Sequence, residues 1–311
     1  MKTYKRYSIL LVLVPVLLLI SACSPALGTG STSSLTAGQI IQNSIQAMKG
    51  LKSAHIESQT SGTLQTIATS ATPTAGTPTP APTSSQLTFN LKGSGDEALP
   101  AQEALQISVS QGANSQTTNL AEIVQGNKVY IQNARGQWYV LDKSTFERFT
   151  GNPFAGVNGL NPNSLPGLLQ DTNVTDHGDE VLNGQSLRHI TITFDKDAFK
   201  KILANNPQLS KMFGQQNINT LLDSTKAFTS SLDVWIDETN FYVHRTELQL
   251  NLNEDVSSLR QSLTPVAIFP LPAGVITSFD STLDLSRFND PVTISTPTSA
   301  IPTDNPFTIF S

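Results

Sequence analysis

Much of the chain alternates between apolar and polar residues, which is the pattern of strands that bury one face of a sheet and expose the other. Three segments show it most clearly, with the apolar sets Leu105, Ile107 and Val109; Leu232, Val234 and Ile236; and Leu248, Leu250 and Leu252. The periodicity predicts strands near residues 54–64, 87–93, 103–111, 117–125, 128–132, 137–141, 173–182, 186–194, 229–237, 241–252 and 275–285.

Short turn sequences separate successive strands. Gly126-Asn127, Arg135-Gly136 and Asn183-Gly184 lie between strand pairs, and so does Glu238-Thr239-Asn240. Glycine and asparagine tolerate the positive φ that tight hairpins need. The order of strands and turns along the chain is that of an antiparallel meander.

A helix is predicted ahead of the first strand. Apolar residues recur at three- and four-residue spacing between Leu35 and Leu51, Thr36 can cap the start, and Gly50 stands where the helix ends. Within residues 143–226, apolar segments around a strand pair predict short helices that pack over one face of the sheet.

Residues 66–86 form a segment rich in Thr, Pro and Ala, without an aromatic or charged residue. Such a segment cannot bury enough apolar surface to offset the entropy of ordering. We expect a disordered insertion in the hairpin between the first two strands.

The N-terminus predicts a lipoprotein signal. Three basic residues precede the apolar run 9–20, and small residues then lead to Cys23, which resembles a lipobox. We expect cleavage before Cys23 and a diacylglyceryl lipid on it, which supplies the two chains of a stable anchor. An uncleaved anchor helix is the alternative, but a span needs ~20 apolar residues and Pro15 interrupts this run.

The domain organisation that follows is a signal peptide at 1–22, a flexible tether at 23–34, one domain at 35–297 and a C-terminal tail at 298–311. The chain has 19 basic and 24 acidic residues, and the signal peptide removes three basic residues and no acidic one. The mature protein is therefore acidic, and nucleic acid is not an expected partner. Because Cys23 is the only cysteine, no disulfide or thiol chemistry is expected.

Catalytic motifs are missing from the sequence. The four histidines are far apart, and neither a metal-hydrolase pattern nor a serine-hydrolase elbow occurs, so no enzyme activity, cofactor or metal is expected. Asp176, Asp179 and Glu180 lie close to His177 and could coordinate a divalent cation. No spacing fixes a ligand set there, and a solvated turn is the preferred alternative.

Several segments resemble, in order, the LppX/LprG-type lipoproteins, relatives of the LolA-like carriers. They are residues 48–56, 126–131, 137–141, 232–237, 243–245 and 283–292. The resemblance covers about residues 45–297 and implies an α+β fold, in which a curved antiparallel β-sheet, a half barrel, has helices packed over its concave face. In that family the fold encloses an apolar cavity for acyl chains. No residue here is identified as a headgroup ligand.

We therefore expect an extracytoplasmic, membrane-anchored lipoprotein that binds or carries a lipid or glycolipid, and that works with an export or transport partner. The cavity would be lined by the apolar sheet face: Leu105, Ile107, Val109, Ile131, Leu232, Val234, Ile236, Leu248 and Leu250. In the alternative, these residues form the packed core of an envelope scaffold or regulatory lipoprotein without a ligand. The two α/β lobes of a solute receptor are disfavoured by the long strand-only stretches.

Overall fold

The structure is a computed structural model, and it describes residues 34–66, 85–99, 102–112, 117–150, 172–205, 222–223, 225, 227–253, 266–267 and 273–310. The predicted signal peptide, Cys23 and residues 67–84 of the predicted insertion lie outside these ranges. Both ends of that insertion are strand residues, since Thr66 pairs with Ser85 between β1 (Ser53–Thr66) and β2 (Ser85–Ala98).

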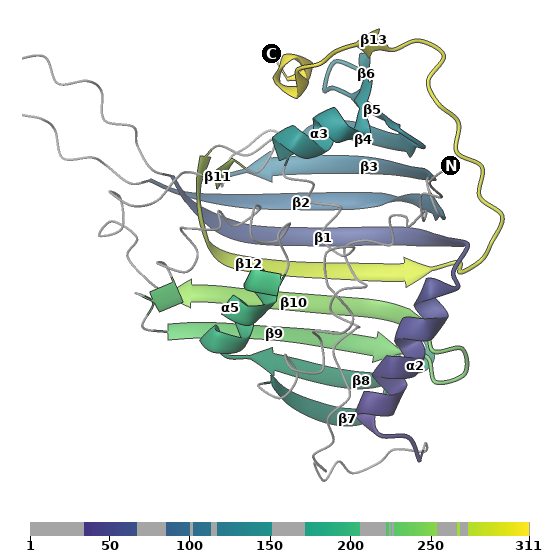
Figure 1. Cartoon of the computed structure of the whole chain (residues 1–311), viewed down its shortest axis with the longest axis vertical. Helices are drawn as coiled ribbons and strands as arrows, with labels where there is room; N and C mark the ends of the chain where they lie inside the picture. Colours follow the sequence, from purple (N-terminus) through teal and green to yellow (C-terminus); the bar gives the residue numbers. More distant parts are fainter. Residues whose placement is uncertain are drawn as a thin grey trace, which may run out of the picture.

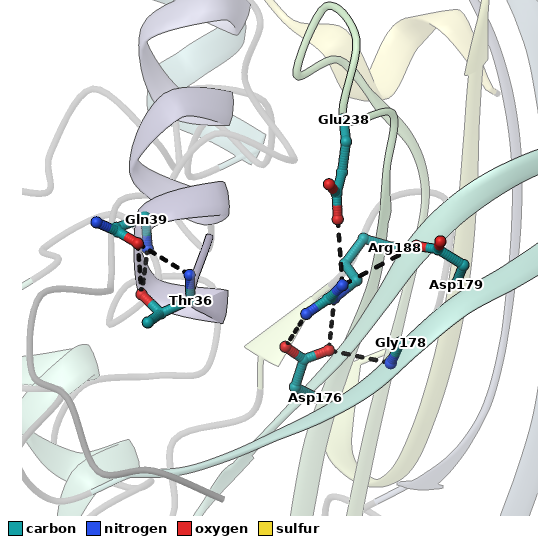
Figure 2. Close-up of polar contacts among 7 residues, drawn as sticks. All are labelled: Thr36, Gln39, Asp176, Gly178, Asp179, Arg188 and Glu238. Atoms are coloured by element: carbon teal, nitrogen blue, oxygen red, sulfur yellow. Dashed lines mark hydrogen bonds and ion pairs between the residues drawn. The ribbon is translucent and has the colours of Figure 1, made fainter. Parts of the chain in front are cut away.

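The first described helix is α2 (Ala37–Lys49), which was predicted ahead of the first strand. Thr36 caps its N-terminus, because its hydroxyl accepts a hydrogen bond from the backbone N–H of Gln39 at 3.3 Å. The Gln39 side chain in turn accepts from the backbone N–H of Thr36 at 2.9 Å (Figure 2). This capping box pairs two backbone donors that a helix start leaves open, and Gly50 caps the other end as predicted.

The strands join into a single open sheet (Figure 1). Beyond β1 and β2 they are β3 (Gln102–Gln111), β4 (Thr118–Gln125), β5 (Lys128–Gln132), β6 (Trp138–Asp142), β7 (Thr172–Leu182), β8 (Gln185–Phe194), β9 (Ala227–Ile236), β10 (Val243–Asn253), β11 (Val266–Ala267), β12 (Ala273–Ser286) and β13 (Ile301–Pro302). Their order is β13-β6-β5-β4-β3-β2-β1-β12-β10-β9-β8-β7, with β11 beside β12. Every pairing is antiparallel except that of β13 with β6.

Each predicted strand is present, and the predicted turns join β4 to β5, β5 to β6, β7 to β8 and β9 to β10. Asn183 and Gly184 have φ of 51° and 81°, which the tight β7–β8 hairpin requires. The sheet differs from one continuous meander, because the consecutive strands β6 and β7 lie towards opposite ends of the strand order and β13 pairs with β6 in parallel. β12 returns to lie between β1 and β10, so that it joins an N-terminal and a C-terminal meander.

All three of the longer described helices pack on the same face of the sheet (Figure 1). α2 buries Ile40, Ile41, Ile45 and Met48 in a cluster with strand residues of β8, β9, β10 and β12. Ala198 of α5 (Lys196–Asn205) joins that cluster, while Phe146 of α3 (Lys143–Thr150) packs in another against β5 and β6. We call this side the helix-covered face and the opposite side the polar face.

The C-terminal residues, expected as a tail, carry β13 and a 3₁₀ helix, η2 (Pro306–Ile309). Ile301 pairs with Tyr139 of β6, and Ile309 is fully buried in the cluster that contains Val129 and Leu141. These residues are therefore part of the packed structure at the β6 end of the sheet.

The predicted fold class is confirmed, since the described chain is mostly strand, with an antiparallel sheet that does not close into a barrel and helices over one face. No helix in the described part of the chain combines the length and apolarity needed to cross a membrane.

Candidate functional site

The residues predicted to line a cavity all lie on the helix-covered face, because the strand register keeps them in phase. Their surroundings differ between the two halves of the sheet. Leu232, Val234 and Ile236 of β9 are buried beneath α2 and belong to a packed core. On β3, in the other half, Ile107 remains partly exposed while Val109 is buried. That these residues line a ligand cavity stays a prediction.

Three glutamates that the sequence analysis did not single out lie on this same face. Glu97 of β2 is directly opposite Glu103 of β3, and Glu122 of β4 is opposite Leu105, two residues further along β3. The exposed fractions of Glu97, Glu103 and Glu122 are only 1%, 5% and 6%. These three residues, called the glutamate cluster below, therefore place three buried carboxyl groups on neighbouring strands of one sheet face.

Burial raises the pKa of every member of the glutamate cluster. Burial, together with repulsion by Glu103, raises the pKa of Glu97 to about 9. Burial and Glu103 raise the pKa of Glu122 to about 8 against the opposing effect of the Lys143 ammonium. Burial raises the pKa of Glu103 to about 7, again opposed by Lys143. The cluster therefore keeps protons near neutral pH, where ordinary glutamates are ionised.

Glu97 also has an unused hydrogen-bonding atom. Among the described residues, Oε1 of Glu97 has no hydrogen-bond partner. Buried polar atoms are nearly always paired, and carboxyl groups with strongly shifted pKa values concentrate at functional sites. A protonated carboxyl group can donate a hydrogen bond to a ligand oxygen and accept one from a ligand hydroxyl. The glutamate cluster can thus form the polar end of an otherwise apolar binding site.

The sequence did contain a signal for the glutamate cluster. Glu103 is in phase with Leu105 and Ile107, and Glu122 is in phase with Leu120 and Val124. Charged side chains are rarely found inside, so a search for apolar residues alone passes over Glu103, which precedes its apolar set, and Glu122, which lies within its set. Extending the period through the charged residue would have found the site.

A second polar cluster on the helix-covered face centres on Arg188 of β8 (Figure 2). The guanidinium is 3% exposed and donates to both carboxylate oxygens of Asp176, at 2.6 and 2.5 Å, and to Glu238 at 3.3 Å. Asp176 also accepts from the backbone N–H of Gly178 at 3.0 Å, and Asp179 lies 4.0 Å from the guanidinium. The acidic residues of the predicted solvated turn belong to β7, where Asp176 and Asp179 face Arg188.

The polar face carries a groove of about 630 Å³ across β10, β12, β1, β2, β3 and β4. Its lining includes charges of both signs, among them Glu57, Lys92 and Arg245. Arg245 donates to both carboxylate oxygens of Asp284, at 2.6 and 2.9 Å, and lies 3.6 Å from Glu247. Because positive and negative side chains both occur in this lining, the groove offers hydrogen-bonding groups but no surface of predominantly one charge.

Comparison with known proteins finds likeness in fold. The sequence matches no protein-family model and no curated protein. Among solved structures, the lipoprotein LppX of Mycobacterium tuberculosis is 18% identical, with 82% of this chain and 96% of that chain covered and a TM-score of 0.40. LprF of Mycobacterium bovis is 14% identical, with coverages of 84% and 96% and a TM-score of 0.39. The lipoprotein type that the sequence motifs resemble is thus among the similar structures, and the likeness concerns the fold alone.

Proposed function

We propose that this chain is a membrane-anchored extracytoplasmic lipoprotein that binds or carries a lipid or glycolipid on its helix-covered face, without catalysing a reaction. Acyl chains contact the apolar residues of β3 and its neighbours, and the headgroup contacts the glutamate cluster. One observation carries the proposal: three buried glutamates, one with an unpaired oxygen, interrupt an apolar sheet face. A core that only stabilises the fold gains nothing from them, because each costs desolvation energy.

The energetics of such a site need no bond chemistry. Each methylene that leaves water contributes ~0.8 kcal/mol, so an acyl chain supplies affinity through contact alone. Protonated carboxyl groups favour neutral hydroxyl groups, such as those of a sugar or glycerol, as hydrogen-bond partners. A phosphate headgroup is disfavoured, because its charge would oppose any carboxyl group that ionises.

The scaffold alternative has one observation in its favour. Leu232, Val234 and Ile236 are packed beneath α2. If the rest of the helix-covered face is packed in the same way, the chain has no room for a ligand and acts through partner proteins. A larger side chain on the helix-covered face, at a position outside that packed core, distinguishes the two functions.

Ile107→Trp is expected to weaken the binding of a fluorescent fatty-acyl probe to delipidated protein about tenfold. A tenfold change equals ~1.4 kcal/mol of binding free energy, which is less than the free energy gained by burying two methylenes. The indole takes space on the helix-covered face that an acyl chain would fill. In a ligand site the free energy of unfolding stays within about 1 kcal/mol of wild type, whereas overpacking a dense core costs ~1–3 kcal/mol. Probe titration and urea unfolding measure the two quantities.

Gln106→Trp is the matched control, since Gln106 is the exposed neighbour of Ile107 and points to the polar face. We expect this variant to take up the probe as wild type does. If Gln106→Trp blocks uptake and Ile107→Trp does not, the ligand lies in the groove of the polar face and the proposal is wrong. A wild-type protein that never takes up the probe supports the scaffold alternative.

Cys23→Ala tests the proposed anchor. The substitution removes the sole thiol, so we expect an unprocessed precursor that incorporates no labelled fatty acid. Two acyl chains hold a protein at a membrane far more firmly than one. Membrane fractionation should therefore show that the variant, which carries neither chain, has lost this lipid anchor. Continued incorporation of the label by the variant would rule out Cys23 as the lipidation site.

A further inference from the structure

A stack of three rings stands on the polar face of β7, β8 and β9, away from the proposed lipid site. The rings of His177 and His189 have centroids 4.4 Å apart, and those of His189 and Trp235 are 4.3 Å apart. The cause is a bulge in β7 between Asp176 and Gly178, opposite His189. A bulge adds one residue and re-aims its side chain, and here it places His177 over His189.

Ligand atoms of three residues converge beside this stack. Nε2 of His189 lies 3.0 Å from Oδ1 of Asp233. Nε2 of His177 lies 2.8 Å from the hydroxyl of Thr191, which also contacts Oδ1 of Asp233. One ligand atom each from His177, His189 and Asp233 lies within 4.8 Å of the other two. His177 is exposed, so an ion in solution can reach these atoms.

His189 faces a carboxylate at each ring nitrogen. Its Nδ1 lies 2.9 Å from Oε2 of Glu180, and that oxygen also accepts a hydrogen bond from Nε1 of Trp235 at 3.0 Å. A neutral imidazole donates from only one nitrogen. With Nδ1–H directed at Glu180, the lone pair of Nε2 points to an oxygen of Asp233, and a cation between these two atoms satisfies both. A carboxylate on the far nitrogen is the usual way to orient a histidine that binds a metal.

We propose that His177, His189 and Asp233 bind a divalent transition-metal ion such as Zn²⁺, with Glu180 as a positioning residue. Two imidazole nitrogens and one carboxylate oxygen are a ligand set of zinc sites that keep a fourth position open. Ca²⁺ and Mg²⁺ prefer oxygen ligands, which disfavours them here. Ligand atoms bound tetrahedrally at ~2.0–2.1 Å lie roughly 3.3 Å apart, so the 3.0 Å between His189 and Asp233 needs only a small adjustment.

The test is titration of the full-length protein with ZnCl₂ by calorimetry, and with CoCl₂ by visible absorption. We expect one ion per chain and the intense bands of four-coordinate Co²⁺. Glu180→Gln should weaken Zn²⁺ binding roughly 10- to 100-fold, the usual effect of losing a partner behind a ligand. His177→Gln and His189→Gln should weaken it more, since each removes a ligand. His244→Gln changes a histidine of β10 that contacts Phe288 and is not one of the proposed ligands, and it should bind as wild type does.

His177→Gln is the decisive variant, because His177 is exposed and its loss leaves the core intact. Circular dichroism of the metal-free variant should match wild type while its Co²⁺ bands disappear. The proposal is overturned if wild type binds no Zn²⁺ at micromolar concentrations. It is also overturned if His177→Gln, His189→Gln and His244→Gln all bind equally well, since the ring stack would then be structural only.

Discussion

Replacing Glu97 with glutamine is expected to stabilise the protein by about 3 kcal/mol at pH 7, and by almost nothing at pH 4. The pKa of Glu97 rises from the ordinary 4.5 to about 9, because the carboxyl group is buried beside Glu103. Between these two values the unfolded chain releases a proton that the folded protein keeps. The stability contribution of Glu97 is therefore complete below pH 4.5 and is lost as the pH rises toward 9.

Glutamine has nearly the same shape and needs no proton, so this pH dependence disappears in Glu97→Gln. The figure of about 3 kcal/mol follows from 1.36 kcal/mol for each pKa unit between 4.5 and pH 7. Urea unfolding at pH 4, 7 and 9 measures it. Glu57→Gln is the control, since Glu57 lies on the polar face with its side chain 65% exposed. Stability curves of Glu97→Gln and wild type that run parallel across this pH range would show that Glu97 is ionised like a surface residue.

Arg188→Met is expected to destabilise the protein by about 2–4 kcal/mol at pH 7. Removing one partner of a buried ion pair costs about 3–5 kcal/mol, and partial exposure of the carboxylates reduces this loss. The guanidinium is 3% exposed, and its loss leaves Asp176 and Glu238 without their cation at exposures of 18% and 22%. Methionine retains the apolar volume of the arginine side chain, so the loss in unfolding free energy measures the contribution of the guanidinium charge.

Arg245→Met provides the comparison for Arg188→Met. Arg245 makes a similar two-bond contact, with Asp284, but on the polar face with 23% of its side chain exposed. We expect it to cost no more than about 1 kcal/mol. Equal losses for both variants in urea unfolding would mean that burial of the Arg188 cluster contributes nothing to the stability of β7 and β8.

The elements that could be predicted are those whose signals are local. Alternation identified all the longer strands, and Thr36 as a possible cap marked the start of α2. The position of β12 between β1 and β10 could not be predicted in this way. It depends on contacts between residues more than 200 positions apart, such as Ile56 with Leu285. Periodicity contains no information on which strands become neighbours.

The sequence did not predict the two candidate sites, and the reason differs between them. Glu103 and Glu122 were in phase with apolar residues, so their signal was present but conflicted with the rule that charge stays outside. For the site at His177, the sequence suggested a cation site with Asp176, Asp179 and Glu180 but not with His189 and Asp233, because that ligand set depends on the bulge in β7 and on side chains from β8 and β9. A bulge shifts the face of one residue without changing composition. Only the three-dimensional register brings these ligand atoms together.

Native mass spectrometry of the full-length protein, isolated from its own membrane, tests the proposed lipid binding most directly. We expect a folded species heavier than the lipidated chain by the mass of one further lipid with a neutral, hydroxyl-bearing headgroup. In Ile107→Trp that additional mass should be reduced or absent, while Gln106→Trp retains it. A wild-type protein that carries only its covalent anchor lipid, under conditions that preserve non-covalent complexes, would show that the chain is not a lipid carrier.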